Sequence, residues 1–277
     1  MRYRSFGKSG QVVSAVSLLL DGRSRQSARE WRDLVRLALD LGINGFELAG
    51  ESPALIEGAT EGLAAVERDL LFVTWRPTAF AADPANTVEA FVARTGLGYL
   101  DMMAFDGPPP NAPSLDDLRR TRRVRAYGLA GQDDESDLLL ARGAFEALAA
   151  PYSPASGWKE RNRIKAAAAR DMAVVAHSIC PDEVLPRPEG ALKRSLFRDR
   201  ANPLVGVGTY RFMDATPGWT PEEICLAYVL TEPAITTARV EVDRPERLER
   251  LAEVPEKDLP TGVAAQIEMA RFSAASA

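Results

Sequence analysis

The sequence predicts an α/β protein with the fold of a (β/α)8 TIM barrel. Eight strand-like segments alternate with eight helix-like segments along the chain, and roughly 250 residues is the usual length of such a barrel. The alternative, a doubly wound open sheet, requires a G-x-G-x-x-G turn after the first strand, where this chain has only Leu20-Asp21-Gly22. No Walker phosphate loop occurs either. We therefore expect one barrel domain that occupies residues 1–277.

The first elements carry clear local signals. Residues 3–14 alternate loosely around glycines and predict an N-terminal hairpin that turns at Lys8-Ser9. Ser27 and Glu30 have the spacing of a capping box and precede apolar residues at helical spacing, so they predict the start of the first helix. Gly42 is expected to end that helix in the left-handed conformation.

The remaining elements follow from the same periodicity. Apolar and β-branched runs predict the eight strands, at residues 15–20, 43–48, 70–74, 99–105, 123–129, 145–150, 172–177 and 235–240. Caps and helical spacing predict eight helices, at residues 27–41, from 52 onward, 83–92, 114–118, 135–140, 159–170, 221–230 and 245–251. Ser52-Pro53 and Asp83-Pro84 mark helix starts, because the first side chain caps free amides and proline has no amide hydrogen to leave unpaired.

One connection is longer than the others. The segment from Pro181 to Gly218 follows the seventh predicted strand, contains several prolines and carries a basic patch between residues 193 and 200. Loops after barrel strands lie at the end of the barrel where ligands bind. We therefore expect this long loop after strand 7 to lie over the mouth of the barrel.

Composition excludes several classes of function. The net charge is −5, whereas a protein that binds duplex nucleic acid needs a basic face. One histidine and two cysteines, Cys180 and Cys225, are too few for a His-rich or Cys-rich metal site or for a disulfide scaffold, and both cysteines are expected to be ordinary core or loop residues. No apolar run approaches the roughly 20 residues that span a bilayer, and the first ten residues have no signal-peptide core. We expect a cytoplasmic protein with no nucleic-acid and no membrane partner.

Several local patterns together resemble the aldo/keto reductase family. They occur in the order expected for that family and cover roughly residues 1 to 255: Phe6-Gly7-Lys8-Ser9-Gly10, Asp40-Leu41-Gly42-Ile43-Asn44-Gly45-Phe46-Glu47, Tyr99-Leu100-Asp101, Val124-Arg125-Ala126-Tyr127-Gly128, Pro151-Tyr152-Ser153, Val174-Val175-Ala176-His177-Ser178 and Arg244-Pro245-Glu246-Arg247. Each match alone is weak, but seven in register favour the fold.

The resemblance implies hydride transfer from NADPH to a carbonyl, with a tyrosine as proton donor, a lysine paired with an aspartate, and a histidine that orients the substrate. In this chain the aspartate position holds Glu47 and the tyrosine position holds Ser52. The lysine position holds Trp75, with Arg76 next to it, and the histidine position holds Asp106. None of the four family residues is retained.

These replacements remove the chemistry of carbonyl reduction. A serine hydroxyl is far too weak an acid to protonate a developing alkoxide, and Ser52 has an adequate role as a helix cap. An indole cannot replace the amine that lowers the pKa of the donor. A carboxylate at position 106 brings negative charge toward a site that must hold an oxyanion. We expect Trp75 to fill the mouth where a ligand would otherwise lie.

The cofactor contacts implied by the resemblance are also largely lost, so the cofactor stays unknown although the family implies NADP. The carboxamide positions hold Ala130, Gly131 and Ala149, and the positions that grip the 2′-phosphate hold Glu241 and Val242. A carboxylate there repels a phosphate. The side chains that remain available for a nucleotide are His177, Ser178, Arg239, Arg244 and Arg247.

Three functions stay open at this point. The first is a barrel that has lost the catalytic tetrad and serves as a non-reductase binding or regulatory protein, with a small molecule or a protein as its unknown partner. The second is an atypical NAD(P)H-dependent oxidoreductase on a small carbonyl substrate, with Tyr127, Tyr152 or His177 as the donor. The third is a different chemistry on the cluster of Glu47, Arg76, Asp106 and His177. In particular, a metal-dependent lyase or hydrolase could use the mouth carboxylates, with Glu47, Glu51, Asp106 and His177 around one cation.

Overall fold

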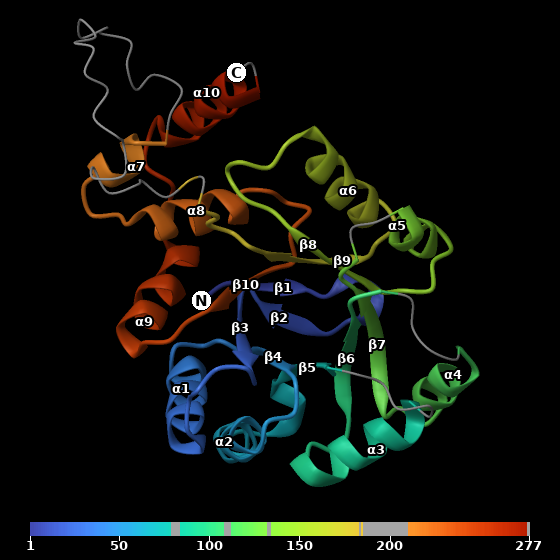
Figure 1. Ribbon diagram of the computed structural model, residues 1–277. Helices are drawn as coiled ribbons and strands as arrows, with labels where there is room; N and C mark the ends of the chain where they lie inside the picture. Colours follow the sequence, from blue (N-terminus) through green and yellow to red (C-terminus); the bar gives the residue numbers. More distant parts are fainter. Residues whose placement is uncertain (79–83, 108–111, 132–133, 183, 185–209, 276–277) are drawn as a thin grey trace, which may run out of the picture.

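The computed structural model describes residues 1–78, 84–107, 112–131, 134–182, 184 and 210–275. Eight parallel strands close into a barrel in the order β10-β3-β4-β5-β6-β7-β8-β9 (Figure 1), which confirms the predicted fold. The strands are β3 (Val16–Asp21), β4 (Gly45–Ala49), β5 (Phe72–Arg76), β6 (Leu100–Phe105), β7 (Val124–Leu129), β8 (Ala147–Pro151), β9 (Ala173–His177) and β10 (Thr237–Glu241).

The barrel closes where the last strand pairs with the first. β10 pairs in parallel with β3, from Ala238 opposite Val16 to Glu241 opposite Leu19, and it also pairs with β9. Because all eight strands are parallel, their carboxyl ends form one rim, which we call the mouth. The last residues of the strands surround it: Asp21, Ala49, Arg76, Phe105, Leu129, Pro151, His177 and Glu241.

In the part of the chain that the structure describes, eight helices surround the barrel, as predicted (Figure 1). They are α1 (Ala28–Asp40), α2 (Pro53–Leu63), α3 (Pro84–Thr95), α4 (Ala112–Arg120), α5 (Asp134–Ala141), α6 (Trp158–Ala168), α8 (Pro221–Leu230) and α9 (Pro245–Glu253). Ser27 and Glu30 form the predicted capping box of α1, and Gly42 adopts a φ of +81°. Within the described ranges, no helix has the length and apolar character needed to cross a membrane.

The N-terminal hairpin covers the amino-terminal end of the barrel. β1 (Tyr3–Ser5) and β2 (Val12–Ser14) pair antiparallel across the 3-10 turn η1 (Gly7–Ser9), as predicted. Phe6 packs on Phe72 of β5 with ring centroids 4.3 Å apart. Phe6 and Val13 continue the apolar column inside the barrel. The hairpin therefore closes the end opposite the mouth.

Two helices, and two further 3-10 turns, were not predicted. α10 (Val263–Ala275) packs through Val263 and Ile267 on α8, outside the ring of helices, and α7 (Phe212–Ala215) is a single turn in the same apolar cluster. The 3-10 turns are η2 (Arg68–Leu70) and η3 (Val254–Glu256). The expected position of the 181–218 loop over the mouth depends on residues 183 and 185–209, which lie outside the described residues, as does the cap Asp83.

Candidate functional site

A cavity of about 650 Å³ opens at the mouth over the ends of β3, β4 and β5. We call it the mouth cavity. Its charged lining consists of four carboxylates and three guanidinium groups, which belong to Asp21, Glu47, Glu51, Asp106, Arg23, Arg76 and Arg239. The site predicted from the sequence at Glu47, Ser52 and Asp106 lies here, since all three residues line this cavity.

The floor of the mouth cavity is an ion cluster of four residues. Glu47 accepts a hydrogen bond from Nε of Arg76 at 2.8 Å and one from Nη1 of Arg239 at 2.5 Å, both on its Oε1 atom. Arg76 also donates through Nη1 to the carboxylate of Asp106. The Glu47 side chain is 5% exposed, whereas Asp106 is 71% exposed. We call these four residues the mouth ion cluster.

The cluster holds Glu47 in its charged form. Burial alone raises the pKa of this carboxyl group, but the charges of Arg239 and Arg76 outweigh burial, so the pKa lies below its usual value. The carboxylates of Glu47 and Asp106 in turn raise the pKa of Arg76 against the effect of its own burial. Glu47 and Arg76 are therefore both charged at neutral pH.

The prediction that Trp75 fills the mouth is wrong. Trp75 is fully buried and faces outward from the barrel, where its indole stacks on Phe91 of α3 at a centroid distance of 4.0 Å. Side chains alternate along a strand, so the next residue of β5, Arg76, faces inward instead. The inward position at the end of this strand is thus occupied by a cation, and its pairing with Glu47 keeps it in place.

Ser52 is the helix cap that the sequence predicts. Its hydroxyl oxygen accepts a hydrogen bond from the backbone amide of Leu55 at the start of α2. It lies on the wall of the mouth cavity, and a capping hydroxyl is held in place by the helix. Ser52 therefore has a structural role at the mouth.

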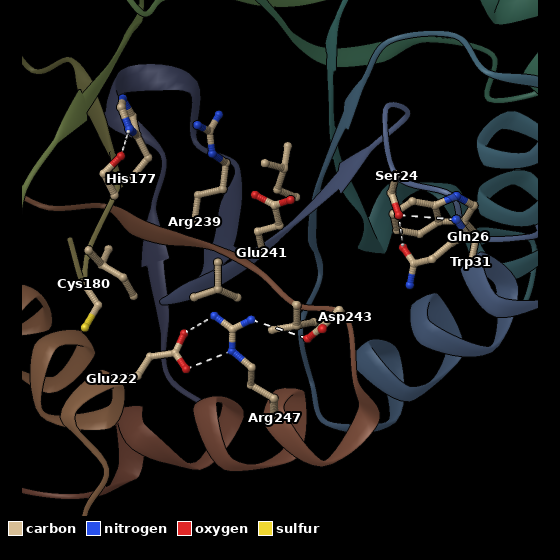
Figure 2. A pocket seen from close by; sticks show the side chains of 15 residues that line it. Ser24, Gln26, Trp31, His177, Cys180, Glu222, Arg239, Glu241, Asp243 and Arg247 are labelled. Carbon is tan, nitrogen blue, oxygen red and sulfur yellow. Dashed lines mark hydrogen bonds and ion pairs between the residues drawn. The ribbon is translucent and has the colours of Figure 1, made fainter. Parts of the chain in front are cut away.

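A second cavity of about 530 Å³ adjoins the first between β9, β10 and the helices α8 and α9 (Figure 2). We call it the side cavity. It shares Leu19 and Arg239 with the mouth cavity. Four of the five residues predicted to contact a nucleotide line it, namely His177, Ser178, Arg239 and Arg247. Arg244 is the exception, because its side chain is 77% exposed and is not part of the lining.

The arginines of the side cavity are already paired with carboxylates (Figure 2). Arg247 forms two hydrogen bonds to Glu222, at 2.9 and 2.6 Å, and lies 3.6 Å from Asp243. Arg244 lies 3.7 Å from Asp243, and Arg239 is held by Glu47. The cavity lining contains three carboxylates, including Glu241, against two guanidinium groups. It therefore offers little net attraction to a phosphate.

The residues present do not fit NADP. The three positions expected to hold the nicotinamide carboxamide have no side-chain amide or hydroxyl: Ala149 is buried inside the barrel, Ala130 packs beside it, and Gly131 has no side chain. A side chain at position 131 would also collide with Ser136. Together with the paired arginines, these positions leave neither end of the dinucleotide with its expected partners.

No phenol reaches the mouth. All six tyrosines lie in the described part of the chain, and none lines the mouth cavity or the side cavity. Tyr127 donates its hydroxyl to the carbonyl of Leu115 at 2.6 Å, in the layer between barrel and helices. Tyr152 is buried in that same apolar layer. The prediction that Tyr127 or Tyr152 replaces the lost donor is therefore not supported by their positions.

His177 ends β9 at the mouth, as predicted, and lines the side cavity. Burial and the charges of Arg239 and Arg76 lower its pKa to about 4, and the carboxylates of Glu47 and Asp106 oppose this shift only in part. Its Nδ1 atom lies 3.1 Å from the hydroxyl of Ser178, which adopts a left-handed φ of 50°. The imidazole is thus neutral at pH 7, and a neutral imidazole is a poor proton donor.

A pH titration tests this electrostatic environment. Since His177 is the sole histidine, its imidazole signals in an NMR titration are unambiguous, and we expect a midpoint near 4. Arg239→Gln removes a cation and should raise the pKa of His177. Arg244→Gln, at an exposed arginine of the same rim, should leave it unchanged. A midpoint above pH 6 in the unmodified protein would contradict the proximity of the two arginines.

The carboxylates at the mouth do not converge as a metal site. Within the ranges that the structure describes, no group of three or more His, Cys, Asp and Glu side chains is placed to hold a metal ion. Glu47 and Asp106 face Arg76, and Glu51 lies 3.8 Å from Arg94. A guanidinium group thus lies where the predicted cation would have to lie, so the arrangement does not support a metal-dependent lyase or hydrolase.

Sequence reasoning grouped Glu47 with Arg76 at the mouth, but it missed their ion pair and the partnership of Glu47 with Arg239. Arg76 is 29 residues and Arg239 is 192 residues from Glu47 in sequence. The available signal was the alternation of inward and outward side chains along each strand, which places all three residues at inward positions near strand ends. A charged side chain inside a barrel requires a partner of opposite charge.

Comparisons with known proteins agree with the barrel fold. The model of the Aldo/keto reductase family matches residues 19–271. Among solved structures, the chain is similar to aldo-keto reductase AKR11C1 from Bacillus halodurans in its holo form, with a TM-score of 0.75 and 15% identity over 97% of this chain and 95% of that one. No protein with curated annotation matches the sequence.

Proposed function

The chain belongs to the aldo/keto reductase family, and we propose that it is a non-reductase member that binds a ligand or a partner at the mouth. The observation that carries this proposal is the mouth ion cluster, in which Arg76 and Arg239 enclose Glu47, while no tyrosine lines the mouth cavity or the side cavity. A carbonyl reductase must deliver a proton to a developing alkoxide. A guanidinium group is not deprotonated in proteins, so an arginine is unsuitable for this step.

The two cavities support a binding role. Together they expose hydroxyl, carboxylate and guanidinium groups of both signs around the shared Arg239. A lining of paired charges favours a small polar ligand of low net charge, because a ligand with several phosphates has no free cation to meet. We propose a regulatory role for such binding and a cytoplasmic location for the protein.

The test is to titrate NADPH and NADH into the purified protein by calorimetry and to follow oxidation of each with a panel of small aldehydes and ketones. We expect no binding up to a cofactor concentration of about 1 mM, which corresponds to a binding free energy weaker than about −4 kcal/mol, and no oxidation. Micromolar binding together with carbonyl-dependent oxidation would overturn the proposal in favour of an atypical reductase.

A matched variant tests whether the pairing of arginines with carboxylates is what prevents NADPH from binding. Glu222→Gln keeps the size of the side chain but removes its negative charge and one of the two oxygens that accept hydrogen bonds from Arg247. We expect this variant to bind NADPH about tenfold more tightly than the unmodified protein, since a freed guanidinium group gains one charge-assisted contact to phosphate. Unchanged affinity would show that arginine pairing is not what excludes the dinucleotide.

A further inference from the structure

The chain contains two cysteines, and the fold brings them together. Cys180 and Cys225 are 45 residues apart in sequence. Cys180 follows the end of β9 by three residues, and Cys225 lies in the middle of α8. The sequence alone assigns them no role beyond ordinary core or loop positions, so their proximity is a property of the fold.

The two thiols meet at the edge of one apolar cluster. Cys225 is fully buried in this cluster with Met213, Ile224 and Tyr228, and Cys180 packs against it from outside. Figure 2 shows the sulfur of Cys180 directed toward α8, the helix that carries Cys225. The neighbouring Cys180 thiol is the main reason that the pKa of Cys225 is raised, and burial adds to it. Cys225 is therefore a protonated thiol at neutral pH.

The two thiols differ in their access to solvent. Cys180 is half-buried and lines the side cavity, so a small molecule that enters the cavity can reach its sulfur. Cys225 is buried inside the cluster against which Cys180 packs. An accessible thiol beside a second, protected thiol is the arrangement that allows a first oxidation product to be trapped as a disulfide before it is oxidised further.

We propose that Cys180 and Cys225 form a peroxide-oxidisable pair that closes a disulfide on the wall of the side cavity. In the first step the sulfur of Cys180 attacks a peroxide oxygen, the O–O bond breaks, and Cys180 becomes a sulfenic acid while water or an alcohol leaves. In the second step the sulfur of Cys225 attacks the sulfur of Cys180 and the S–O bond breaks. The proton of Cys225 passes to the departing hydroxyl, which leaves as water. Two thiols thus lose two electrons, which reduce the peroxide.

This inference does not depend on the proposed function, because it needs only the packing of Cys180 against the cluster that contains Cys225 and the place of Cys180 on the cavity wall. The bond would join the segment that follows β9 to α8. Cross-linking residues so far apart in sequence restricts the unfolded chain. Oxidation is therefore expected to stabilise the protein and to change the wall of the side cavity.

Thiol titration of the folded protein tests the proposal directly. The protein is treated with a small excess of hydrogen peroxide, quenched, unfolded in denaturant and titrated with a thiol reagent. We expect both thiols to be lost, the intact mass to match an intramolecular disulfide, and both thiols to return after treatment with dithiothreitol. A protein that keeps one thiol, that gains oxygen irreversibly, or that forms linked dimers would overturn the proposal.

Two matched variants identify the order of events. In Cys225→Ala the sulfenic acid of Cys180 has no partner, so it should be trapped by dimedone, whereas the unmodified protein should yield little adduct. In Cys180→Ala the remaining thiol should resist peroxide in the folded state. For the unmodified protein, oxidation should raise Tm by about 5 °C or more. Equal reactivity of the two single-cysteine variants would contradict the assigned roles.

Discussion

Replacing Glu47 with glutamine is expected to lower the free energy of unfolding by about 3–5 kcal/mol, the usual effect of removing one partner from a buried ion pair. Glu47 is 5% exposed and accepts hydrogen bonds from both Arg76 and Arg239. Without this charge, Arg239 loses the carboxylate with which it pairs, and Arg76 keeps its ion pair with the exposed Asp106. Urea unfolding at pH 7, followed by circular dichroism, measures the change.

A carboxylate at the same mouth provides the control. Glu51 lies four residues along the chain, is 35% exposed and lies 3.8 Å from Arg94. Because partly exposed ion pairs contribute little to stability, Glu51→Gln should change the free energy of unfolding by no more than about 0.5 kcal/mol. Equal unfolding midpoints for the Glu47 and Glu51 variants would refute the central role of Glu47.

Acid should remove the contribution of Glu47. Its pKa in the folded protein is below the usual value, because Arg239 and Arg76 outweigh the opposing effect of burial. A carboxyl group with a lowered folded pKa adds stability that is fully present above its unfolded pKa, about 4.3, and is lost as the pH falls through the folded pKa. The difference between the unmodified protein and Glu47→Gln should therefore be constant from pH 7 to 5 and should shrink at lower pH.

Local signals were sufficient to predict most of the fold. The capping box at Ser27, the cap at Ser52 and the glycine stop at Gly42 all lie where the sequence predicts them. Each of these signals depends only on residues that are close together in the sequence, so it can be recognised without the structure. α10 was missed because its buried residues pack on α8 rather than on the barrel. Its sequence shows no continuation of the strand and helix alternation that predicted the other helices.

The site was harder to predict than the fold, for two physical reasons. Neighbouring side chains on a strand point to opposite faces, so an alignment to the family that is wrong by one residue assigns the wrong side chain to the barrel interior. For this reason the sequence predicted Trp75 at the mouth, where the structure has Arg76. Charge pairing joins residues from different strands, and no local pattern indicates which cation a buried carboxylate will meet. The absence of a phenol was predictable in part, since no tyrosine lies between Arg4 and Gly98. The outward positions of Tyr127 and Tyr152 required the structure.

Asp101 is the corresponding buried charge at the opposite end of the barrel. It is fully buried in β6 and accepts four hydrogen bonds, from Gln11 in the hairpin at 2.5 Å, Arg68 at 2.8 Å, the amide of Val73 at 2.8 Å and Arg125 at 3.2 Å. These donors come from the hairpin, η2, β5 and β7. One carboxylate thus joins four segments at the end of the barrel where residues act in stability and not in ligand binding.

Replacing Asp101 with alanine is expected to cost about 3–5 kcal/mol of unfolding free energy. The substitution leaves the Arg68 and Arg125 side chains without their shared carboxylate and leaves the amide of Val73 without an acceptor, and an unpaired buried amide alone costs about 1–3 kcal/mol. Asp69→Ala is the matched control, since Asp69 is an exposed acid at the same end and should change stability by no more than about 0.5 kcal/mol.

The titration of His177 distinguishes variants at the mouth from variants at the opposite end of the barrel. Glu47 lies near His177 and raises its pKa, so Glu47→Gln should move that pKa further below 4. Asp101 is not among the charges that act on His177, so Asp101→Ala should destabilise the fold and leave the midpoint near 4. If both variants shifted the His177 midpoint, the loss of stability would reflect general loosening of the barrel. If Asp101→Ala unfolded at the same urea concentration as Asp69→Ala, the four hydrogen bonds would not support the barrel as argued.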